Sequence, residues 1–382
     1  MSLPNDRTGL QLRSLLTADG DLRISLERME IARPGSDQVV VAVEATPINP
    51  SDLGLLLGPA DLSTAVASGS RDAPVLTARM PEAGVRALAG RIGQSLPVGN
   101  EGAGTVVEAG DAPEAQALLG KRVAMLGGAM YAQYRVMRAA DCLLLPDGAT
   151  AADGASCFVN PLTVLGMVET MRLENHKALV HTAAASNLGQ MLVKLCQEEG
   201  IGLVNVVRSA EQVALLRGLG AEHVLDSTSA SFMGELTDAL ATTGATLAFD
   251  AIGGGRLASQ LLSGMEAAAT RQGGEFSRYG SNVHKQVYIY GALDLRPTEL
   301  SRSFGFAWGV CGWLLTPMLG RLGPDGVQRM RQRVIAGLKT TFASHYTREI
   351  SLFEALDPSV MAVYNRRATG EKYLIDPSRP AA

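Results

Sequence analysis

The stretch Leu179-Val-His-Thr-Ala-Ala-Ala-Ser-Asn-Leu-Gly-Gln190 decides how this chain folds. An apolar run ends at Thr182, four small residues follow it, and Asn187 opens a segment whose apolar residues recur at the spacing of one helix face. The pattern predicts a strand, a tight turn and the first turn of a helix. Backbone N–H groups and the positive end of the helix dipole converge at such a turn, and both favour a bound phosphate group.

The same alternation of strands and helices continues through the middle of the chain. Strands are expected at 178–182, 203–207, 223–226, 246–250 and 287–290. Helices are expected between them at 187–199, 210–219, 231–242 and 255–270. This alternation is typical of a doubly wound parallel sheet, whereas both ends of the chain contain short strands and tight turns. The sequence therefore predicts an α/β protein with a β-rich domain (1–155 and 343–382) and a doubly wound domain (156–342).

Composition limits the partners and the cellular location that we expect. The 382 residues are 46% hydrophobic and 19% charged, which is enough apolar material for two domains with cores. A net charge of −4 argues against nucleic acid or an anionic membrane as the main partner. The cysteines Cys142, Cys157, Cys196 and Cys311 form no Cys-x-x-Cys pair and lie near no histidine at a metal-ligand spacing. We therefore expect reduced thiols, a cytoplasmic protein and no structural zinc.

Two glycine-rich stretches precede the doubly wound part. Residues 58–98 are rich in Ala, Ser, Gly and Pro, and a helix is expected there from Pro81 to about Gln94. A connection of this length is typical of a lid or a binding loop. Residues 99–104 look like a phosphate loop, but a strand follows them where a phosphate loop needs a helix. We interpret these glycines as sites of close backbone packing.

The turn after the first strand of the doubly wound part keeps only one glycine of the dinucleotide fingerprint, Gly189. Small residues still allow a close approach, and the Ser186 hydroxyl can donate to a phosphate. Arg208 ends the next strand, where an acidic residue would bind the ribose hydroxyls of NAD. An arginine there can hold a 2′-phosphate instead, which favours NADPH. The alternative is a solvated arginine at a strand end.

Two more turns lie at the carboxyl ends of expected strands, at 250–254 and at 291–293. Ligands bind outside the carboxyl ends of strands in such sheets, so both turns are expected to face the bound cofactor. Ordinary turn chemistry is the alternative for each of them.

Several segments, in order along nearly the whole chain, resemble the zinc-free branch of the medium-chain dehydrogenase/reductase superfamily. They are 39–52, 98–104, 145–148, 159–163, 179–190, 205–208 and 220–224. The resemblance implies a GroES-like catalytic domain and a Rossmann domain. Together with the turns above, it indicates these cofactor-binding residues: Asn160, Thr163, Ala185, Ser186, Asn187, Leu188, Gly189, Arg208, Ala251, Ile252, Gly291, Ala292, Leu293 and Lys372. For Lys372, a surface role is an equal alternative.

The sequence departs from two patterns of that superfamily. Zinc-containing members carry a cysteine where Asn49 stands and a histidine where Asn100 stands, and they have a four-cysteine lobe that this chain lacks. The resemblance therefore implies neither a catalytic nor a structural zinc. Enoyl thioester reductases carry a catalytic tyrosine shortly after the Asn-Pro-Ser-Asp motif, whereas residues 53–60 contain none.

A conjugated acceptor is the substrate that these features favour. Hydride addition to a quinone or an enone gives an anion that the substrate itself delocalises, so positioning and a few hydrogen bonds suffice. We hypothesise an NADPH-dependent oxidoreductase that acts on a quinone or another α,β-unsaturated carbonyl, with Asn49 and Tyr131 as candidate catalytic groups. An enoyl thioester reductase and a non-catalytic NADPH-binding sensor are the alternatives.

A homodimer is also expected. The uncharged segment 304–315 contains both tryptophans of the chain. It follows the fifth expected strand, where members of the superfamily add an edge strand across a dimer interface.

Overall fold

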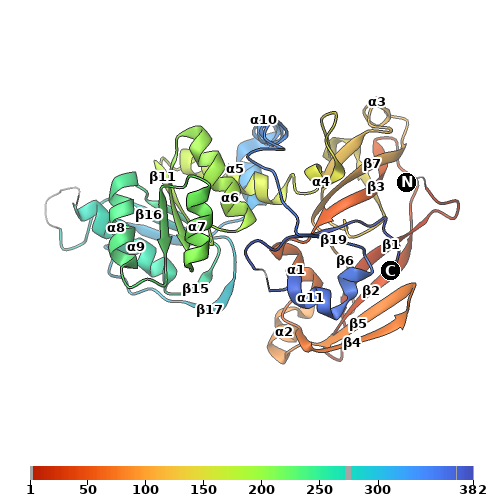
Figure 1. Ribbon diagram of the computed structural model, residues 1–382, viewed down its shortest axis with the longest axis horizontal. Coiled ribbons are helices and arrows are strands. Elements are labelled where there is room, and N and C mark those ends of the chain that lie inside the picture. The colour runs from red at the N-terminus through yellow and green to blue at the C-terminus, as the bar shows by residue number, and fades with distance from the viewer. Residues whose placement is uncertain (1–2, 272–276, 367, 382) are drawn as a thin grey trace. The chain divides into compact units, whose positions relative to one another are not determined.

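A computed structural model describes residues 3–271, 277–366 and 368–381. Its contacts divide the chain into two compact units, residues 1–159 with 334–382 (unit 1) and residues 160–333 (unit 2). The boundaries predicted from the sequence fell after residues 155 and 342. Figure 1 labels many of the elements of both units.

Unit 2 is built on a six-stranded parallel sheet in the order β13-β12-β11-β14-β16-β18. The strands are β11 (Ala178–Thr182), β12 (Gly202–Val207), β13 (His223–Asp226), β14 (Leu247–Asp250), β16 (Lys285–Ile289) and β18 (Trp308–Gly312). The chain starts in the middle of the sheet, runs to one edge, returns and then runs to the other edge. This is the doubly wound order, so the predicted fold class is confirmed for this unit.

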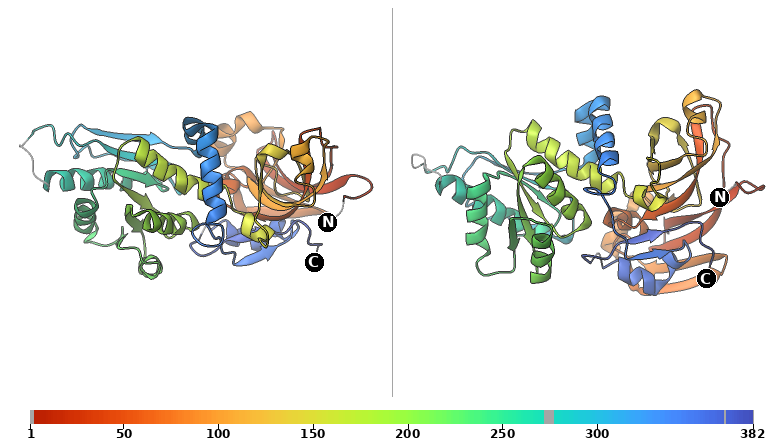
Figure 2. Two further views of the ribbon diagram at one scale, coloured as in Figure 1. Left: turned by 90° about the horizontal axis from the view of Figure 1, so that it is seen from above. Right: turned by 45° about the horizontal axis from the view of Figure 1, so that its top comes forward.

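Helices cover both faces of this sheet (Figures 1 and 2). They are α5 (Val159–Leu173), α6 (Asn187–Glu199), α7 (Ala210–Gly218), α8 (Phe232–Thr243), α9 (Leu257–Arg271) and α10 (Leu315–Ala336). The side chains of Val180 and Val204 pack with α8 and α9 in one buried core. His181 points from β11 to the opposite face, where Phe249 and Trp313 pack edge to face. Two short strands, β15 (Gly253–Gly255) and β17 (Asp294–Thr298), form a separate ribbon.

Unit 1 is β-rich and contains two sheets, with strand orders β4-β5-β2-β1-β6 and β10-β8-β7-β3-β20-β19; β9 also pairs with β3. The strands are β1 (Thr8–Leu16), β2 (Asp21–Glu30), β3 (Gln38–Pro47), β4 (Asp61–Ser70), β5 (Ala73–Arg79), β6 (Ser95–Pro97), β7 (Glu101–Ala109), β8 (Arg122–Leu126), β9 (Tyr134–Arg138), β10 (Cys142–Leu144), β19 (Arg348–Ile350) and β20 (Tyr373–Ile375). Residues 39–43 of β3 are fully buried, which explains their run of Val and Ala.

Short helices close the turns of unit 1. They are α1 (Pro50–Leu56), α2 (Glu82–Ala87), α3 (Pro113–Gln116), α4 (Ala151–Gly154) and α11 (Pro358–Tyr364), with 3₁₀ turns η1 (Ala89–Arg91), η2 (Ala139–Asp141) and η3 (Glu354–Leu356). By length and composition the stretch 151–173 could cross a membrane, but 78% of its apolar window is buried in the fold. It is therefore weak evidence for a membrane span.

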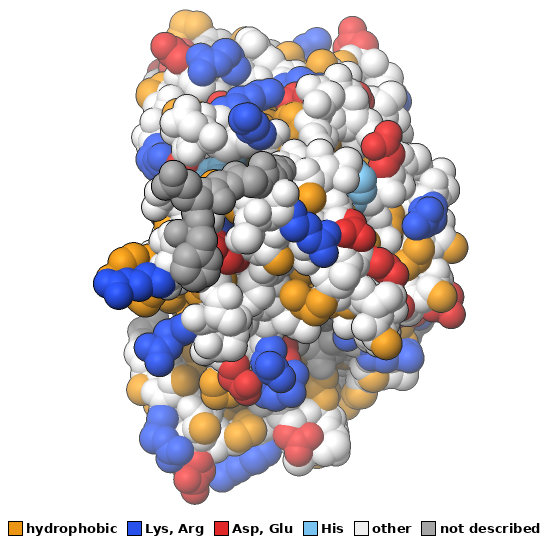
Figure 3. Space-filling view, turned by 90° about the vertical axis from the view of Figure 1, so that its left-hand side faces the viewer, with side chains coloured by type: hydrophobic (Ala, Val, Ile, Leu, Met, Phe, Trp, Pro, Cys, Tyr) orange, Lys and Arg blue, Asp and Glu red, His pale blue; other side chains and the backbone are white. Residues whose placement is uncertain are grey.

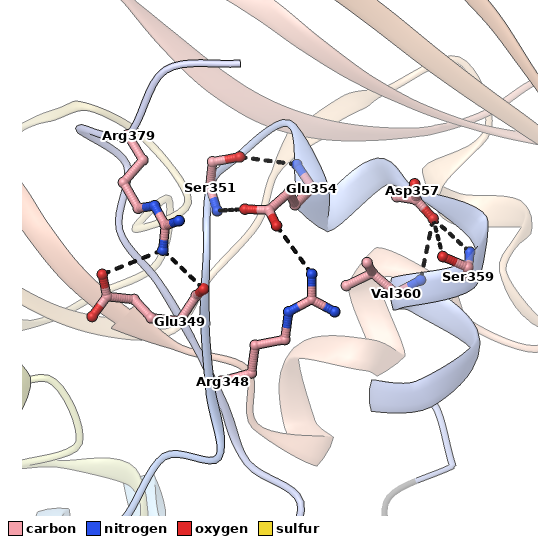
Figure 4. A network of polar contacts seen from close by, with 8 residues as sticks. All are labelled: Arg348, Glu349, Ser351, Glu354, Asp357, Ser359, Val360 and Arg379. Carbon is pink, nitrogen blue, oxygen red and sulfur yellow. Dashed lines mark hydrogen bonds and ion pairs between the residues drawn. The ribbon is translucent and has the colours of Figure 1, made fainter. Parts of the chain in front are cut away.

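The C-terminal segment returns to unit 1 and pairs with β3. Strand β20 lies antiparallel to β3, with Leu374 opposite Pro47. Polar contacts stabilise this segment (Figure 4). The Glu354 carboxylate accepts from the Arg348 guanidinium at 3.1 Å and from the Ser351 N–H at 2.8 Å. The pairing brings Lys372, one residue before β20, next to the strand that leads into Asn49.

The interpretation of 58–98 as a lid or a binding loop is corrected by the structure. Strands β4 and β5 form a hairpin, and β5 pairs with β2, where Leu76 lies opposite Ile24. The helix expected at 81–94 is only the short α2 and η1. Pairing with a distant strand overrides the weak local preference of this Ala-, Ser- and Gly-rich segment.

The glycines of 99–104 allow close backbone packing, as expected. A Cβ atom on Gly104 would lie 1.9 Å from the carbonyl oxygen of Ala42, and one on Gly102 would lie 3.0 Å from that of Ala45. Both glycines belong to β7, which pairs with β3. The phosphate-loop appearance of this stretch therefore comes from sheet packing.

Gly104→Ala is expected to lower the free energy of unfolding by about 2–3 kcal/mol, because the added methyl group overpacks a buried backbone contact. Urea denaturation measures the change. Gly90→Ala is the matched control, because its Cβ meets nothing within 4 Å. Equal stability of the two variants would contradict this account of Gly104.

Candidate active site

Unit 2 contains the predicted phosphate turn between β11 and α6. Ser186 is the N-cap residue of α6, and its Oγ accepts from the Gly189 N–H at 3.2 Å. The hydroxyl proton of Ser186 can still be donated to a phosphate oxygen. The first turn of an α-helix points N–H groups out of the helix end, and here that turn is Asn187, Leu188 and Gly189. The geometry suits an anion held at the end of α6.

Two residues let this turn keep its shape with one glycine. A Cβ on Gly189 would lie 2.1 Å from the carbonyl oxygen of Ala184, so only glycine allows the helix to approach the turn this closely. Ala183 has a φ of +50°, in the left-handed region that glycine usually occupies. Backbone strain at Ala183 thus replaces the missing first glycine of the fingerprint.

Arg208 lies at the carboxyl end of β12 with its side chain exposed. Its backbone N–H donates to Gln212 Oε1 at 3.0 Å, and Ser209 caps the following helix α7. Among the described residues no carboxylate forms an ion pair with Arg208. The guanidinium is therefore available to an added anion at this strand end.

A buried network links the ends of β11 and β14. Thr182 Oγ1 donates to Asp250 Oδ1 at 2.8 Å and accepts from the Ala251 N–H at 2.8 Å. The Asp250 carboxylate also accepts from the Ile252 N–H at 2.9 Å. The network shapes the turn that follows β14 at the carboxyl edge of the sheet.

The turn after β16 packs against this turn. The Leu293 N–H donates to the Ala251 carbonyl at 3.2 Å, and a Cβ on Gly291 would lie 2.6 Å from that carbonyl oxygen. The five residues predicted in these two turns, which also include Ile252 and Ala292, are therefore neighbours. Asn160 and Thr163 lie in the first turns of α5.

A cavity of about 780 Å³ opens beside the turn after β16, within unit 2. It lies between the carboxyl halves of β16 and β18 and the start of α10. Its lining is mainly aromatic and aliphatic: Tyr288, Ile289, Tyr290, Gly291, Ala292, Gly312, Trp313, Leu314, Pro317, Met318 and Arg321. Arg321 is the one charged lining residue, and its guanidinium lies 3.1 Å from Glu174 Oε1. The volume and lining suit a flat or extended apolar ligand.

Unit 1 contains a buried polar cluster around Asn49. Asn49 Nδ2 donates to Glu101 Oε1 at 2.8 Å, and Glu101 Oε2 accepts from the Phe158 and Val159 N–H groups, each at 2.9 Å. Asp52 accepts from the Asn49 N–H at 2.8 Å and caps α1. The Oδ1 atom of Asn49 is buried without a partner among the described residues. It is an acceptor that a ligand could satisfy.

Tyr131, the second candidate catalytic residue, lies in the same cluster. Its hydroxyl donates to the Pro47 carbonyl at 3.1 Å, and its side chain is fully buried. The hydroxyl also contacts Asp52. Both contacts hold the backbone that carries Asn49, so the geometry gives Tyr131 a positioning role.

Lys372 joins the cluster from the C-terminal segment. Its Nζ donates to Ser156 Oγ at 2.9 Å and to Ser344 Oγ at 3.4 Å. The ammonium interacts electrostatically with the carboxylates of Glu101 and Asp52. Lys372 is therefore bound within unit 1 and is no isolated surface lysine.

No protein-family model matches this chain. Among solved structures, it is similar over 99% of its length to one described as an NADPH:quinone reductase from Mesorhizobium loti, at 26% identity and a TM-score of 0.73; it covers 100% of that chain. An enoyl thioester reductase from Candida tropicalis, in a mutant form, matches at 17% identity and a TM-score of 0.66, which shows the fold alone. That match covers 97% of this chain and 99% of the other.

Among curated proteins, the mitochondrial enoyl-[acyl-carrier-protein] reductase of Xenopus tropicalis is 27% identical over 220 residues, which are 53% of this chain. The chain spans about half of that relative, 51% of its length. A mycocerosic acid synthase-like polyketide synthase of Mycolicibacterium smegmatis is 24% identical over 78% of this chain and 12% of its own length.

The resemblance to the medium-chain dehydrogenase/reductase superfamily, in its quinone reductase and enoyl reductase branch, is confirmed. The fold class, a GroES-like unit and a Rossmann unit, is confirmed with it.

The positions that bind zinc in other members of this superfamily have another role in this chain. Asn100 donates from its backbone N–H to Asp52 Oδ1 at 2.9 Å and from Nδ2 to Ser51 Oγ at 3.1 Å. Asn49 is bound to Glu101. Within the described residues, no three His, Cys, Asp or Glu side chains are grouped as metal ligands would be. Zinc independence stays a prediction for a chelator to test.

Burial dominates the electrostatics of the cluster in unit 1. Burial and, to a smaller extent, the nearby Glu101 carboxylate raise the pKa of Asp52 to about 7. Burial also raises the pKa of Glu101, against the opposing effect of Lys372. Burial lowers the pKa of Lys372 to about 8, although both carboxylates favour its charged form. The pKa values of Asp52 and Lys372 therefore lie near neutral pH.

Sequence reasoning missed several residues of the site: Thr182, Asp52, Glu101, Ser156 and Tyr346. Thr182, Glu101 and Asp52 had a local signal, because each belongs to a segment that resembles the superfamily. Nothing in the sequence indicated that the carboxylates of Glu101 and Asp52 are buried.

The stability of the protein is expected to fall as pH rises from about 5 to 7, in part because of Asp52. Its folded-state pKa is raised to about 7, so the folded state holds a proton that the unfolded state releases. Asp52→Asn should remove up to about 1.4 kcal/mol per pH unit of this slope. Urea unfolding of both proteins at a series of pH values measures it. A variant with the same slope as the wild type would contradict the raised pKa.

Proposed function

We propose that this protein is an NADPH-dependent oxidoreductase that transfers hydride to a quinone or another α,β-unsaturated carbonyl. The observation that carries the proposal is the phosphate turn of unit 2 together with Arg208, with which no carboxylate of the described residues forms an ion pair. The fold shared with the NADPH:quinone reductase of Mesorhizobium loti supports it.

The residues of unit 2 fit the proposed cofactor. Ser186 and the first turn of α6 would bind the pyrophosphate, and Arg208 would bind the 2′-phosphate. The paired turns at 251–252 and 291–293 would border the nicotinamide end. When bound, NADPH supplies the hydride. The start of α5, with Asn160 and Thr163, would complete the site within unit 2.

We place the apolar part of the acceptor in the 780 Å³ cavity of unit 2, because Tyr290 and Trp313 present aromatic surface there. Asn49 of unit 1, whose Nδ2 already donates to Glu101, is proposed as a positioning group that exchanges no proton. The delocalised anion of a conjugated acceptor suits such a site.

Enoyl thioester reduction is the second candidate. It is favoured by the similarity to the enoyl-[acyl-carrier-protein] reductase of Xenopus tropicalis. Against it stands the helix α1 and the turn after it, 50–60, which contain no tyrosine. A reductase of this kind needs an acid from elsewhere in the chain.

The deciding experiment follows NADPH oxidation with a quinone, an enone, an enoyl thioester and a simple ketone, each with and without a chelator. We expect turnover of the conjugated acceptors, little with the ketone, and no effect of the chelator. Tight NADPH binding without turnover of any acceptor would favour the sensor, and loss of activity with chelator would refute zinc independence.

Arg208→Ala is expected to raise the Kd for NADPH about 10- to 100-fold and to leave the Kd for NADH unchanged, because a charged hydrogen bond to the 2′-phosphate is lost. Isothermal titration calorimetry measures both. Arg217→Ala, an exposed arginine at the end of α7, is the matched control. A preference for NADH that Arg208→Ala does not alter would remove the 2′-phosphate argument.

We also propose a cytoplasmic homodimer with a small-molecule substrate and no nucleic-acid or membrane partner. On the face drawn in Figure 3, basic and acidic side chains are interspersed and do not gather by sign. Strand β18 ends its sheet, and the exposed apolar side chains Leu295, Phe306 and Leu314 lie in nearby segments. An exposed strand edge of this kind favours pairing with a second chain.

Light scattering is expected to give twice the chain mass of 40.1 kDa. Cys311→Lys places a charge on the exposed edge strand β18 and should shift the protein to monomer. Val66→Lys, at an exposed position of β4, an edge strand of a sheet in unit 1, should leave the dimer intact. A monomeric wild type would refute the dimer.

A further inference from the structure

His181 is a fully buried histidine of β11 that is bonded to one of the residues lining the cavity of unit 2. Its Nε2 atom and the Tyr290 hydroxyl oxygen are 2.7 Å apart, and the two rings stack with their centroids 5.8 Å apart. Its Nδ1 atom is buried without a hydrogen-bond partner among the described residues. Burial lowers the pKa of His181 to about 3, so the ring is neutral and carries a single proton, on Nε2 or on Nδ1.

The surroundings of the two ring nitrogens favour the proton on Nε2. A proton on Nδ1 would make a buried N–H donor without an acceptor, which is rare in folded proteins. Asn205, opposite His181 on β12, supplies no acceptor, because no described group bonds to its buried amide oxygen. With the proton on Nε2, His181 donates to the Tyr290 oxygen, and the Tyr290 O–H can donate elsewhere. Tyr290 is half-buried and lines the cavity, where water or a ligand can accept that proton.

The other neutral side-chain donors of the cavity lining are already bonded within unit 2. The Tyr288 hydroxyl donates to the Glu174 carboxylate at 3.0 Å, and Trp313 Nε1 donates to Thr170 Oγ1 at 3.1 Å. Of the neutral side-chain donors in the described lining, the Tyr290 O–H is therefore the one that stays available to a ligand.

We propose that Tyr290 binds the carbonyl oxygen of the acceptor through its O–H group, with His181 as the positioning residue behind it. The proposal rests on the proposed function, which places the acceptor in this cavity. A single neutral donor among aromatic and aliphatic walls fits a flat ligand that carries a carbonyl group. Negative charge grows on that oxygen as the hydride arrives, and a hydrogen bond from the phenol stabilises it.

The position of Tyr290 suits this role. Its backbone N–H donates to the Asp250 carbonyl at 3.0 Å, which fixes the end of β16 to the end of β14. Tyr290 directly precedes the turn 291–293, which would border the nicotinamide end of the cofactor. Burial raises the pKa of the Tyr290 hydroxyl, so the phenol keeps its proton and remains a donor. All of these groups belong to unit 2.

Two ligands of similar shape isolate the proposed hydrogen bond. 1,4-Naphthoquinone carries carbonyl oxygens, whereas naphthalene has none and contacts the aromatic walls in the same way. Equilibrium dialysis without NADPH measures the Kd of each ligand. Tyr290→Phe is expected to raise the Kd for 1,4-naphthoquinone about 5- to 10-fold and to change that for naphthalene less than about twofold, because only a hydrogen bond is lost.

Tyr288→Phe is the matched variant, because it removes a hydroxyl that donates to Glu174 from the same lining. It should change both Kd values by the same factor. His181→Leu should reduce the preference for the quinone over naphthalene about threefold, because the phenol loses the donor that orients it. ¹⁵N NMR of the wild type, with the His181 signal assigned by its loss in His181→Leu, should show the proton on Nε2.

Three outcomes would overturn the inference. They are an equal change of both Kd values in Tyr290→Phe, a His181 proton on Nδ1, and a wild-type protein that binds neither ligand. The proposed function fails differently, since its failure is the absence of NADPH oxidation with any acceptor. Because the Kd values are measured without NADPH, the expected loss of quinone binding in Tyr290→Phe would support the carbonyl site even then.

Discussion

The buried carboxylate of Glu101 is the interaction on which the polar part of unit 1 depends. It binds the Asn49 side chain at the start of α1 and the backbone N–H groups of Phe158 and Val159 at the start of α5. A buried carboxylate is costly unless its oxygens are satisfied and a positive charge is near. Four partners, including Lys372, meet that need here. Three segments far apart in the sequence are fixed around one side chain as a result.

The doubly wound unit was largely predictable because its signals are local. The strand at 178–182 and the helix at 187–199 follow from an apolar run, small turn residues and helical spacing, and the structure has the same bounds. The hairpin of β4 and β5 was not predictable in this way. Its Ala-, Ser- and Gly-rich strands are stabilised by pairing with β2, some fifty residues earlier, and no window of sequence contains that partner.

The residues of the candidate site also differ in whether a local pattern in the sequence indicates them. The places of Arg208 and Gly189 in the fold were predictable because each stands at a defined place in a βα turn, and their contact with a cofactor stays a prediction. Ser156 and Tyr346 meet across 190 positions of sequence, and their contact depends on where the C-terminal segment returns. Lys372 was indicated only by resemblance, and the structure explains its position through the pairing of β20 with β3. Side chains gathered by tertiary structure have no spacing rule that a sequence could display.

The two units differ in the kind of chemical group on which each relies. Unit 2 would hold the cofactor mainly with backbone N–H groups and one arginine. Small residues in a turn and an arginine at a strand end are local features that a sequence displays directly. Unit 1 relies on buried charges whose pKa values depend on all of their neighbours together, as those of Asp52 and Lys372 show. A turn can therefore tolerate an alanine in place of glycine, as at Ala183, while the polar cluster must be kept or replaced as a whole.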